Sequence, residues 1–316
     1  MALDRRAELG EFLRSRRARL RPDELGLPDH GGRRRVPGLR REELALLAGV
    51  SVDHYVRLEQ GRTLHFSEEV LDAVARALRL DPVEREHLFR LARPWSGTDA
   101  PSAPQTVRPG LRRLLDAASD VPAYVVGRGT DVLAWNHLAA ALITDFGALP
   151  PERRNLARLV CQDEGMRALY EDWPGKVADI AAYLRLDASR HPDDPRTAAL
   201  VEELTETCPE FRAAWEKQQV RDKTHGGYVY LHPAVGRVDL SYETLRLPDD
   251  PDQALIAHTV EEGSPSEAAL RILATLAHRP ERAACGAHSV GGAHSVGGAH
   301  SVGGAHEPRG VTRPDS

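Results

Sequence analysis

Apolar residues recur at the spacing of a helix face through the first part of the chain. In residues 3–20 the apolar positions Leu9, Phe12 and Leu13 are surrounded by arginines, as on an amphipathic helix. A segment rich in proline and glycine at 22–40 interrupts the pattern and predicts an irregular loop. Beyond it, residues that cap helix N-termini precede further short apolar repeats. We therefore expect five helices within residues 1–92, the last four beginning near Arg41, Ser51, Ser67 and Asp81.

The pattern changes after a linker at 93–110 that is rich in proline, serine and threonine. Residues 121–136 predict two strands around Gly127–Gly129, followed by a helix that Asn136 caps. A long helical middle follows, and residues 226–248 then alternate apolar and polar positions, as antiparallel strands do. One more strand near 253–263 and a helix capped by Ser264 or Ser266 complete the pattern. We expect an α/β domain over 111–280, with an antiparallel sheet and helices that close one face.

The end of the chain repeats the sequence AHSVGG three times at 287–304. Such a stretch has too little apolar volume for a core, so we expect 281–316 to be disordered. A slipped coding repeat explains its histidines better than metal binding does, because only Cys285 adds a further ligand type. A metal-responsive regulator that uses this tail stays an alternative, and no metal site is predicted. The repeating histidines are His288, His294, His300 and His306.

Composition supports a two-domain protein and divides its charge unevenly. The chain has 316 residues and a net charge of −5. Residues 1–110 carry 20 arginines against 17 acidic residues, whereas 111–316 carry 22 basic against 30 acidic residues. A basic first part suits a DNA-binding head, although a solvated charged surface would also allow it. The 39 arginines against three lysines are ascribed to GC-rich coding.

The sequence predicts neither a membrane-spanning nor a secreted protein. No apolar run approaches the roughly 20 residues that span a bilayer, so we expect no membrane span. The charged N-terminus has no apolar signal region, and the three cysteines form no close pair. We therefore expect a protein of the reducing cytoplasm.

The stretch "RREELALLAGVSVDHYVRLEQGR" (40–62) predicts two short helices joined by a tight corner. Ala45 and Ala48 are small enough for close helix packing, Gly49 permits the turn and Val50 fills the corner. The expected core-facing residues are Leu44, Leu47, Tyr55 and Leu58. An ordinary helical hairpin is the alternative, but the pattern falls in register with a five-helix unit and favours DNA binding.

The second helix of this pair exposes side chains where base edges would lie. Arg57 suits guanine, and Val52 suits a thymine methyl group. Asp53 either accepts from a cytosine amino group or holds Arg57 in place. Arg41 begins the preceding helix, where it is placed to meet a phosphate. The candidate DNA-binding residues are Arg33, Arg34, Arg35, Arg40, Arg41, Ser51, Val52, Asp53, His54, Arg57 and Arg62.

Because of these residues, the segment 9–92 resembles the lambda-repressor-like (XRE/Cro-type) helix-turn-helix domain. The longer stretch "GRRRVPGLRREELALLAGVSVDHYVRLEQGR" is more narrowly similar to the MmyB-like regulators, which have a long basic loop before the second helix. The resemblance implies an all-α DNA-binding domain. It also implies that Arg17 pairs with Glu59, and that both residues are structural rather than base-reading.

The second half of the chain resembles the ligand-binding domain of the same family. The segments are "DVLAWNHLAAALI", "ERRNLARLV", "ALYEDW", "RHPDDPR", "CPEFRAAW" and "YETLRLPDDP". The resemblance implies a PAS-like fold that accepts fatty acids or similar lipids, and it extends over about 9–278. The stretch "VCQDEGM" is more polar than is usual in that family.

A hollow between a sheet and its helices is a common place for a small ligand. Aromatic and apolar residues of this domain are candidates to line it, with core packing as the alternative for each. Tyr228 and Tyr230 alternate on one predicted strand and therefore point to one face. The candidate ligand-binding residues are Tyr124, Trp135, Leu138, Trp173, Trp215, Tyr228, Tyr230 and Tyr242.

Signals of catalysis are weak. The chain contains no GxSxG, no phosphate-binding glycine loop and no HExxH. His225, His232 and His258 are too scattered for a metal site. Arg221 or Arg246 would suit a lipid carboxylate, although surface ion pairs explain them better. We therefore predict no catalytic residue and no cofactor apart from a possible fatty-acid effector.

The sequence predicts a transcription regulator with double-stranded DNA and a small hydrophobic ligand as partners, assembled as a homodimer. An enzyme fused to a DNA-binding head and a DNA-binding scaffold without effector are the alternatives, besides the metal-responsive regulator.

Overall fold

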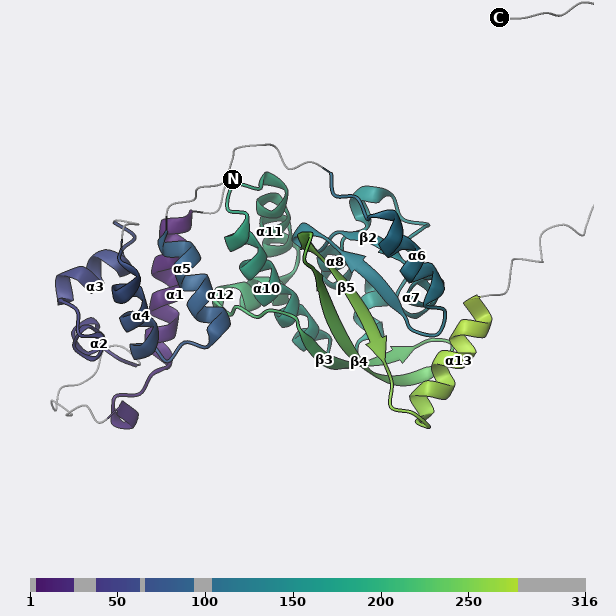
Figure 1. Ribbon diagram of the computed structural model, residues 1–316. Helices are drawn as coiled ribbons and strands as arrows, with labels where there is room; N and C mark the ends of the chain where they lie inside the picture. Colours follow the sequence, from purple (N-terminus) through teal and green to yellow (C-terminus); the bar gives the residue numbers. More distant parts are fainter. Residues whose placement is uncertain (1–3, 26–37, 63–65, 94–103, 278–316) are drawn as a thin grey trace, which may run out of the picture. The chain divides into compact units, whose positions relative to one another are not determined.

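The computed structural model describes residues 4–25, 38–62, 66–93 and 104–277 (Figure 1). The candidate residues Arg33, Arg34 and Arg35 lie outside these ranges. So do most of the predicted linker and the whole histidine-containing tail. The boundaries predicted for the domains therefore stay predictions.

Five α-helices form in the described part of the first 92 residues, as the sequence predicted. They are α1 (Arg5–Arg19), α2 (Arg41–Ala48), α3 (Val52–Glu59), α4 (Glu68–Ala77) and α5 (Pro82–Ala92), with a short 3-10 helix η1 (Asp23–Leu25) in the loop. Ser51, Ser67 and Asp81 each cap a helix through a side-chain oxygen. Buried leucines and Phe12 from all five helices form one core. We call this five-helix part the head.

One expected core residue of the head is exposed. Leu44 and Ala45 of α2 are fully buried, but Leu47 is 38% exposed. A helix of two turns presents only a narrow face to its neighbours, and Leu44, Ala45 and Ala48 already occupy that face. The prediction that Leu47 faces the core was wrong.

The second part of the chain contains one five-stranded antiparallel sheet in the order β2-β1-β5-β4-β3. The outer strands are each bonded to a neighbouring loop at one point. On β2 the amide of Val132 donates to the carbonyl of Arg154, and on β3 the amide of Glu171 donates to the carbonyl of Val229. The strands are β1 (Ala123–Val126), β2 (Val132–Trp135), β3 (His225–His232), β4 (Gly236–Leu247) and β5 (Asp250–Thr259).

Most helices of this part pack on one face of the sheet and enclose its main core (Figure 1). They are α7 (His137–Leu142), α8 (Leu156–Gln162), α9 (Glu164–Leu169), α10 (Trp173–Arg190), α11 (Pro195–Thr207), α12 (Pro209–Glu216) and α13 (Pro265–Ala277), with the 3-10 turns η2 (Arg128–Thr130) and η3 (Pro151–Arg153). Asn136 caps α7 by accepting from Ala139, as predicted. Ser264 accepts from the amide of Glu267 at the start of α13, while Ser266 bonds to the sheet.

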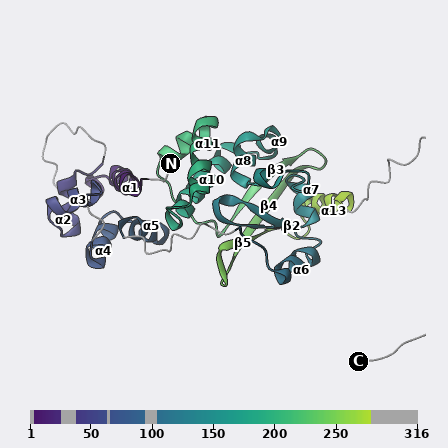
Figure 2. The same cartoon turned by 90° about the horizontal axis from the view of Figure 1, so that it is seen from above.

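The sequence predicted helices that close one face of the sheet, and the structure covers the other face as well. Helix α6 (Pro109–Ala117) packs on that face through Leu111 and Leu115, which meet Val125 and Leu255. Figure 2 shows α6 on the opposite side of the sheet from α8 and α11. This second layer explains why every residue of β1 is buried. The prediction of helices on one face only was therefore incomplete, because α6 begins inside the segment that was assigned to the linker.

No helix among the described residues is long and apolar enough to cross a membrane.

Candidate DNA-binding surface and ligand cavity

The corner between α2 and α3 has the geometry that the sequence predicted. Gly49 ends α2 with φ of 67°, a left-handed backbone conformation that residues other than glycine rarely adopt. The amide of Val50 donates to the carbonyl of Ala45 at 3.0 Å, and the Ser51 hydroxyl accepts from the amide of His54 at 3.1 Å. These bonds fix the start of α3, and they leave its first turn exposed.

The exposed side of α3 carries the candidate base-reading residues. Val52 is 42% exposed, and His54 lies against Phe66 with ring centroids 5.3 Å apart. Arg57 forms an ion pair with Asp53 at 2.8 Å, and both side chains are more than half exposed. This ion pair fits the second of the two roles predicted for Asp53, in which it holds Arg57 in place. Arg40 at the start of α2, Ser51 at the start of α3 and Arg62 after the end of α3 are also exposed.

A buried carboxylate joins three helices behind this surface. Glu59 is fully buried, and it accepts from Arg17 of α1 at 3.0 Å, the pair that the resemblance implied. Arg41 of α2 also donates to Glu59, at 2.9 Å, while its side chain stays 40% exposed. Burial raises the pKa of Glu59, but the bonds from Arg17 outweigh burial and hold this pKa below its ordinary value. Arg41 is thus bonded within the head through its Nε. The phosphate contact predicted for Arg41 would use the other N–H groups of its guanidinium.

The second part contains a narrow cavity on the inner face of the sheet. Its free volume is about 30 Å³, enough for about two water molecules. Strands β1, β3, β4 and β5 form one wall, and α8 and α10 form the opposite wall. The lining residues are Tyr124, Val126, Thr130, Leu156, Lys176, Ile180, Tyr183, Lys223, Tyr228, Tyr242, Thr244, Ala254, Ile256 and His258.

Three of the eight predicted ligand-binding residues line this cavity, namely Tyr124, Tyr228 and Tyr242. The other five lie elsewhere. Trp173 donates its indole N–H to the carbonyl of Val160 at 2.7 Å, and Trp135 packs on Phe146. The three that line the cavity all lie on strands of the sheet, whereas Trp173 and Trp215 lie on helices and Tyr230 belongs to the main core. The five residues outside the lining are Trp135, Leu138, Trp173, Trp215 and Tyr230.

Two lysines in the cavity were missed by the sequence analysis. Lys176 of α10 is only 2% exposed, and its Nζ lies 3.9 Å from the centroid of the Tyr228 ring. Lys223 precedes β3 and lines the same space. Two signals were present in the sequence. Only three of the 42 basic residues are lysines, and Lys176 shares a helix face with Ile180 and Tyr183, at spacings of four and seven.

The charges around the lysines are unbalanced. Among the described residues no carboxylate lies within 4 Å of either lysine. Asp179 is the acidic residue nearby, and it already accepts from Arg221 at 2.7 Å and from the Tyr228 hydroxyl at 2.9 Å. Burial, and then the charge of Lys223, hold the pKa of Lys176 well below its ordinary value, and burial lowers the pKa of Lys223 to about 8.

Buried polar atoms at the cavity lack protein partners. Both ring nitrogens of His258 and the Thr244 hydroxyl are buried without a hydrogen bond. Burial, together with the charge of Lys176, lowers the pKa of His258 to about 3, so this imidazole is neutral near pH 7. These atoms could therefore bond to a polar group that enters the cavity, and such bonds would offset the cost of burying them.

The low pKa of His258 has a consequence for acid stability. The unfolded chain takes up a proton near pH 6.5, whereas folded His258 does so only near pH 3, so stability falls as the pH drops through that window. We expect His258→Phe to reduce the loss of unfolding free energy between pH 7 and pH 5 by about 2 kcal/mol. Urea denaturation at both pH values measures it. The exposed His225, changed to Gln, is the control, and an equal reduction in both variants would contradict the assignment.

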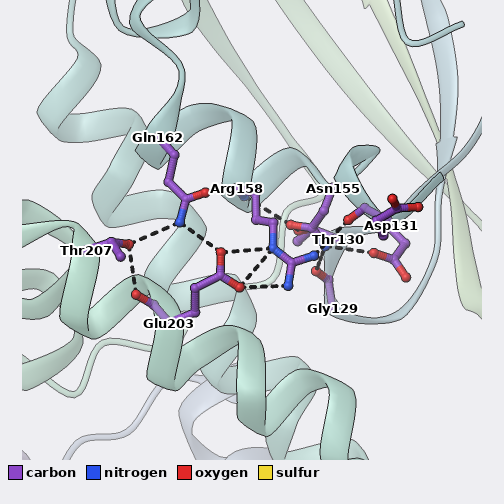
Figure 3. A network of polar contacts seen from close by, with 9 residues as sticks. Gly129, Thr130, Asp131, Asn155, Arg158, Gln162, Glu203 and Thr207 are labelled. Carbon is purple, nitrogen blue, oxygen red and sulfur yellow. Dashed lines mark hydrogen bonds and ion pairs between the residues drawn. The ribbon is translucent and has the colours of Figure 1, made fainter. Parts of the chain in front are cut away.

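A polar network fixes the cavity wall formed by η2 and α8 (Figure 3). Asn155 is 2% exposed, and its amide donates to the carbonyl of Gly129 at 2.7 Å and to Asp131 at 2.8 Å. Arg158 donates to Glu203 of α11 at 2.7 Å. Thr130 and Leu156, which line the cavity, follow Gly129 and Asn155 directly. The network therefore fixes the position of this cavity wall.

Helix α10 also contacts the head. Its first half carries Lys176 and Ile180 at the cavity, and its second half carries Arg185, which is ion-paired with Glu8 of α1. The Arg185 guanidinium lies 3.9 Å from the centroid of the Trp215 ring. A shift of α10 caused by a ligand would thus reach a residue that contacts the head.

Among the described residues no group of three or more His, Cys, Asp or Glu side chains is arranged to hold a metal ion.

Comparisons with known proteins identify both parts of the chain. A family model described as the MmyB-like transcription regulator ligand binding domain matches residues 107–273, more than half of the chain. A helix-turn-helix domain model matches residues 8–88. No curated protein matches the chain. The first match includes every residue that lines the cavity, and the second includes α2, α3 and α4 with most of α1 and of α5.

Proposed function

Since the chain belongs to the MmyB-like family of transcription regulators, DNA-binding proteins with a ligand-binding domain, we propose that it responds to a fatty acid. In this proposal a homodimer reads two DNA half-sites through the exposed turn of α3. The fatty acid binds in the cavity of the second domain and changes the affinity for DNA. The observation that carries the proposal is the narrow cavity with a mostly apolar surface, whose lining residues all lie within the match to the family's ligand-binding domain.

The walls of the cavity support an acyl chain. Val126, Ile180 and Ile256 offer apolar surface, and each methylene that leaves water contributes about 0.8 kcal/mol. A chain of ten or so methylenes therefore supplies roughly the affinity of a micromolar complex. The free volume of about 30 Å³ is too small for such a chain, so helices and sheet must separate for it to enter. Binding is then necessarily coupled to a rearrangement.

The proposal is tested by titrating the full chain with saturated fatty acids from octanoate to octadecanoate. DNA selected by the protein from a random pool serves as the operator. We expect affinity for the fatty acid to rise with chain length, pass through a maximum and fall, and we expect the best ligand to change the affinity for this operator. Absence of binding, or binding that is independent of chain length, would refute the fatty-acid proposal. Mass spectrometry of the recovered ligand shows whether it is chemically unchanged, as we infer for a binding domain that is not an enzyme.

The DNA-binding part of the proposal has its own test. We expect Arg57→Ala to weaken binding to the selected operator by about 1–3 kcal/mol and to relax the base preference at one position. Arg57 is held by Asp53 on the exposed turn of α3, ready to meet a base. Fluorescence anisotropy with the operator and with single-base variants measures both effects. Arg76→Ala, an exposed arginine of α4, is the matched control. Unchanged discrimination in Arg57→Ala would mean that another surface reads the bases.

A further inference from the structure

Two of the three lysines in the chain meet in the cavity, and neither supports the fold through an ion pair with a described carboxylate. Burial of an ammonium group without a carboxylate partner is costly even where aromatic rings lie beside it, as Tyr170 and Tyr228 lie beside Lys176. An apolar side chain of similar size would fill the space without that cost. The third lysine, Lys217, is exposed. The position of the other two therefore calls for an explanation other than stability.

We propose that Lys176 and Lys223 together bind the acidic group of the ligand, and that the ligand enters the cavity as an anion. This inference rests on the proposed function, which places a ligand in the cavity but does not say what anchors it. Two ammonium groups and the unpartnered atoms of His258 and Thr244 can surround a carboxylate from several sides.

The balance of charge around the pair favours an anion. Lys176, Lys223 and Arg221 face one carboxylate, that of Asp179, which Arg221 and Tyr228 already engage. A bound carboxylate would balance the positive charge that Lys176 and Lys223 carry when they are protonated. The other titratable groups that face the pair from the surrounding elements are neutral near pH 7, namely Tyr124, Tyr170, Tyr228, Tyr242 and His258.

Anion binding should also draw in a proton. Without ligand, burial and mutual repulsion hold both lysine pKa values down, that of Lys223 to about 8. A carboxylate between them favours the charged form of each and raises both pKa values. We expect uptake of up to about one proton per ligand near pH 7. Above pH 8 the affinity for the anion should fall, because the lysines must then gain protons for it to bind.

The test compares dodecanoate with dodecan-1-ol, which has the same chain without the charge. Calorimetric titration of the full chain in two buffers with different ionisation enthalpies gives affinity and proton uptake together. We expect dodecanoate to bind at least about tenfold more tightly than the alcohol, with proton uptake for the acid alone. Lys176→Met and Lys223→Met should each remove this preference while dodecan-1-ol binding is kept. Lys217→Met is the matched control and should change neither.

The results of this titration distinguish failure of the lysine anchor from failure of the fatty-acid proposal. If acid and alcohol bind equally, the cavity takes an acyl chain but the lysines do not anchor it, and the inference is wrong. If neither binds, the fatty-acid proposal fails and the inference fails with it. Thermal unfolding gives an independent readout. A merely structural lysine should lower the melting temperature when it is replaced, whereas we expect Lys176→Met to fold and to melt at least as high as the unchanged protein.

Discussion

We expect Glu59→Ala to destabilise the head by about 3–5 kcal/mol and to abolish DNA binding. Glu59 is fully buried, and its carboxylate accepts from Arg17 of α1 and from Arg41 of α2. Without it, the largely buried Arg17 guanidinium loses its acidic partner, and α3 loses its connection to two other helices. A loss of this size is a large part of the stability of a small domain.

Hydrogen exchange followed by mass spectrometry locates this effect. Peptides from residues 4–93 should exchange faster in Glu59→Ala, whereas peptides from the sheet should change little. Glu86→Ala is the matched control, because Glu86 is more than half exposed and pairs only with Arg90 in the next turn of the same helix. A head that stays as protected in Glu59→Ala as in Glu86→Ala would show that the buried carboxylate is dispensable.

The second large effect is expected from Asn155→Ala in the ligand-binding domain. The buried side chain of Asn155 donates to the Gly129 carbonyl and to Asp131, and it caps α8 by accepting from the amide of Arg158. Alanine leaves the carbonyl and the amide without partners, and loss of a cap alone costs about 1 kcal/mol. We expect a total destabilisation of about 2–4 kcal/mol and weaker ligand binding, because Thr130 and Leu156 would no longer be held in place.

Chemical denaturation with a tryptophan signal measures the change, since all but one of the four tryptophans belong to this domain. Gln162→Ala removes an exposed amide from the outer end of the same network and should cost less than about 0.5 kcal/mol. Similar losses of unfolding free energy in Asn155→Ala and Gln162→Ala would mean that Asn155 is not the central residue of the network.

The elements of the head were predictable because local chemistry determines them. Ser51, Ser67 and Asp81 cap their helices from one position before the first turn, and Gly49 marks the corner. The pair of Arg17 and Glu59 followed from the family resemblance, because the two residues are far apart in the sequence. Leu47 was misplaced because periodicity alone does not show how wide the buried face of a two-turn helix is.

The cavity was less predictable because its lining comes from strands and helices far apart in the sequence. Aromatic content drew attention to Trp173, whose N–H has a backbone partner in the core. Lys176 was overlooked because a lysine on an amphipathic helix usually faces water. Here α10 is packed on several sides, so the residue four positions before Ile180 is buried with it. Only the sheet register shows that His258, opposite Tyr242 on the neighbouring strand, lines the same space.

The outer strands of the sheet bear on how two copies of the chain can associate. An unpaired strand edge is a place where a second chain can add a strand of its own. On β2 the amide of Val132 is occupied by the Arg154 carbonyl, and on β3 the Val229 carbonyl is occupied by the amide of Glu171. The first bond lies at the first residue of β2, and the second lies in the second half of β3. A second chain that added a strand to either edge would find one position already occupied, which disfavours end-to-end growth of the sheet from protomer to protomer.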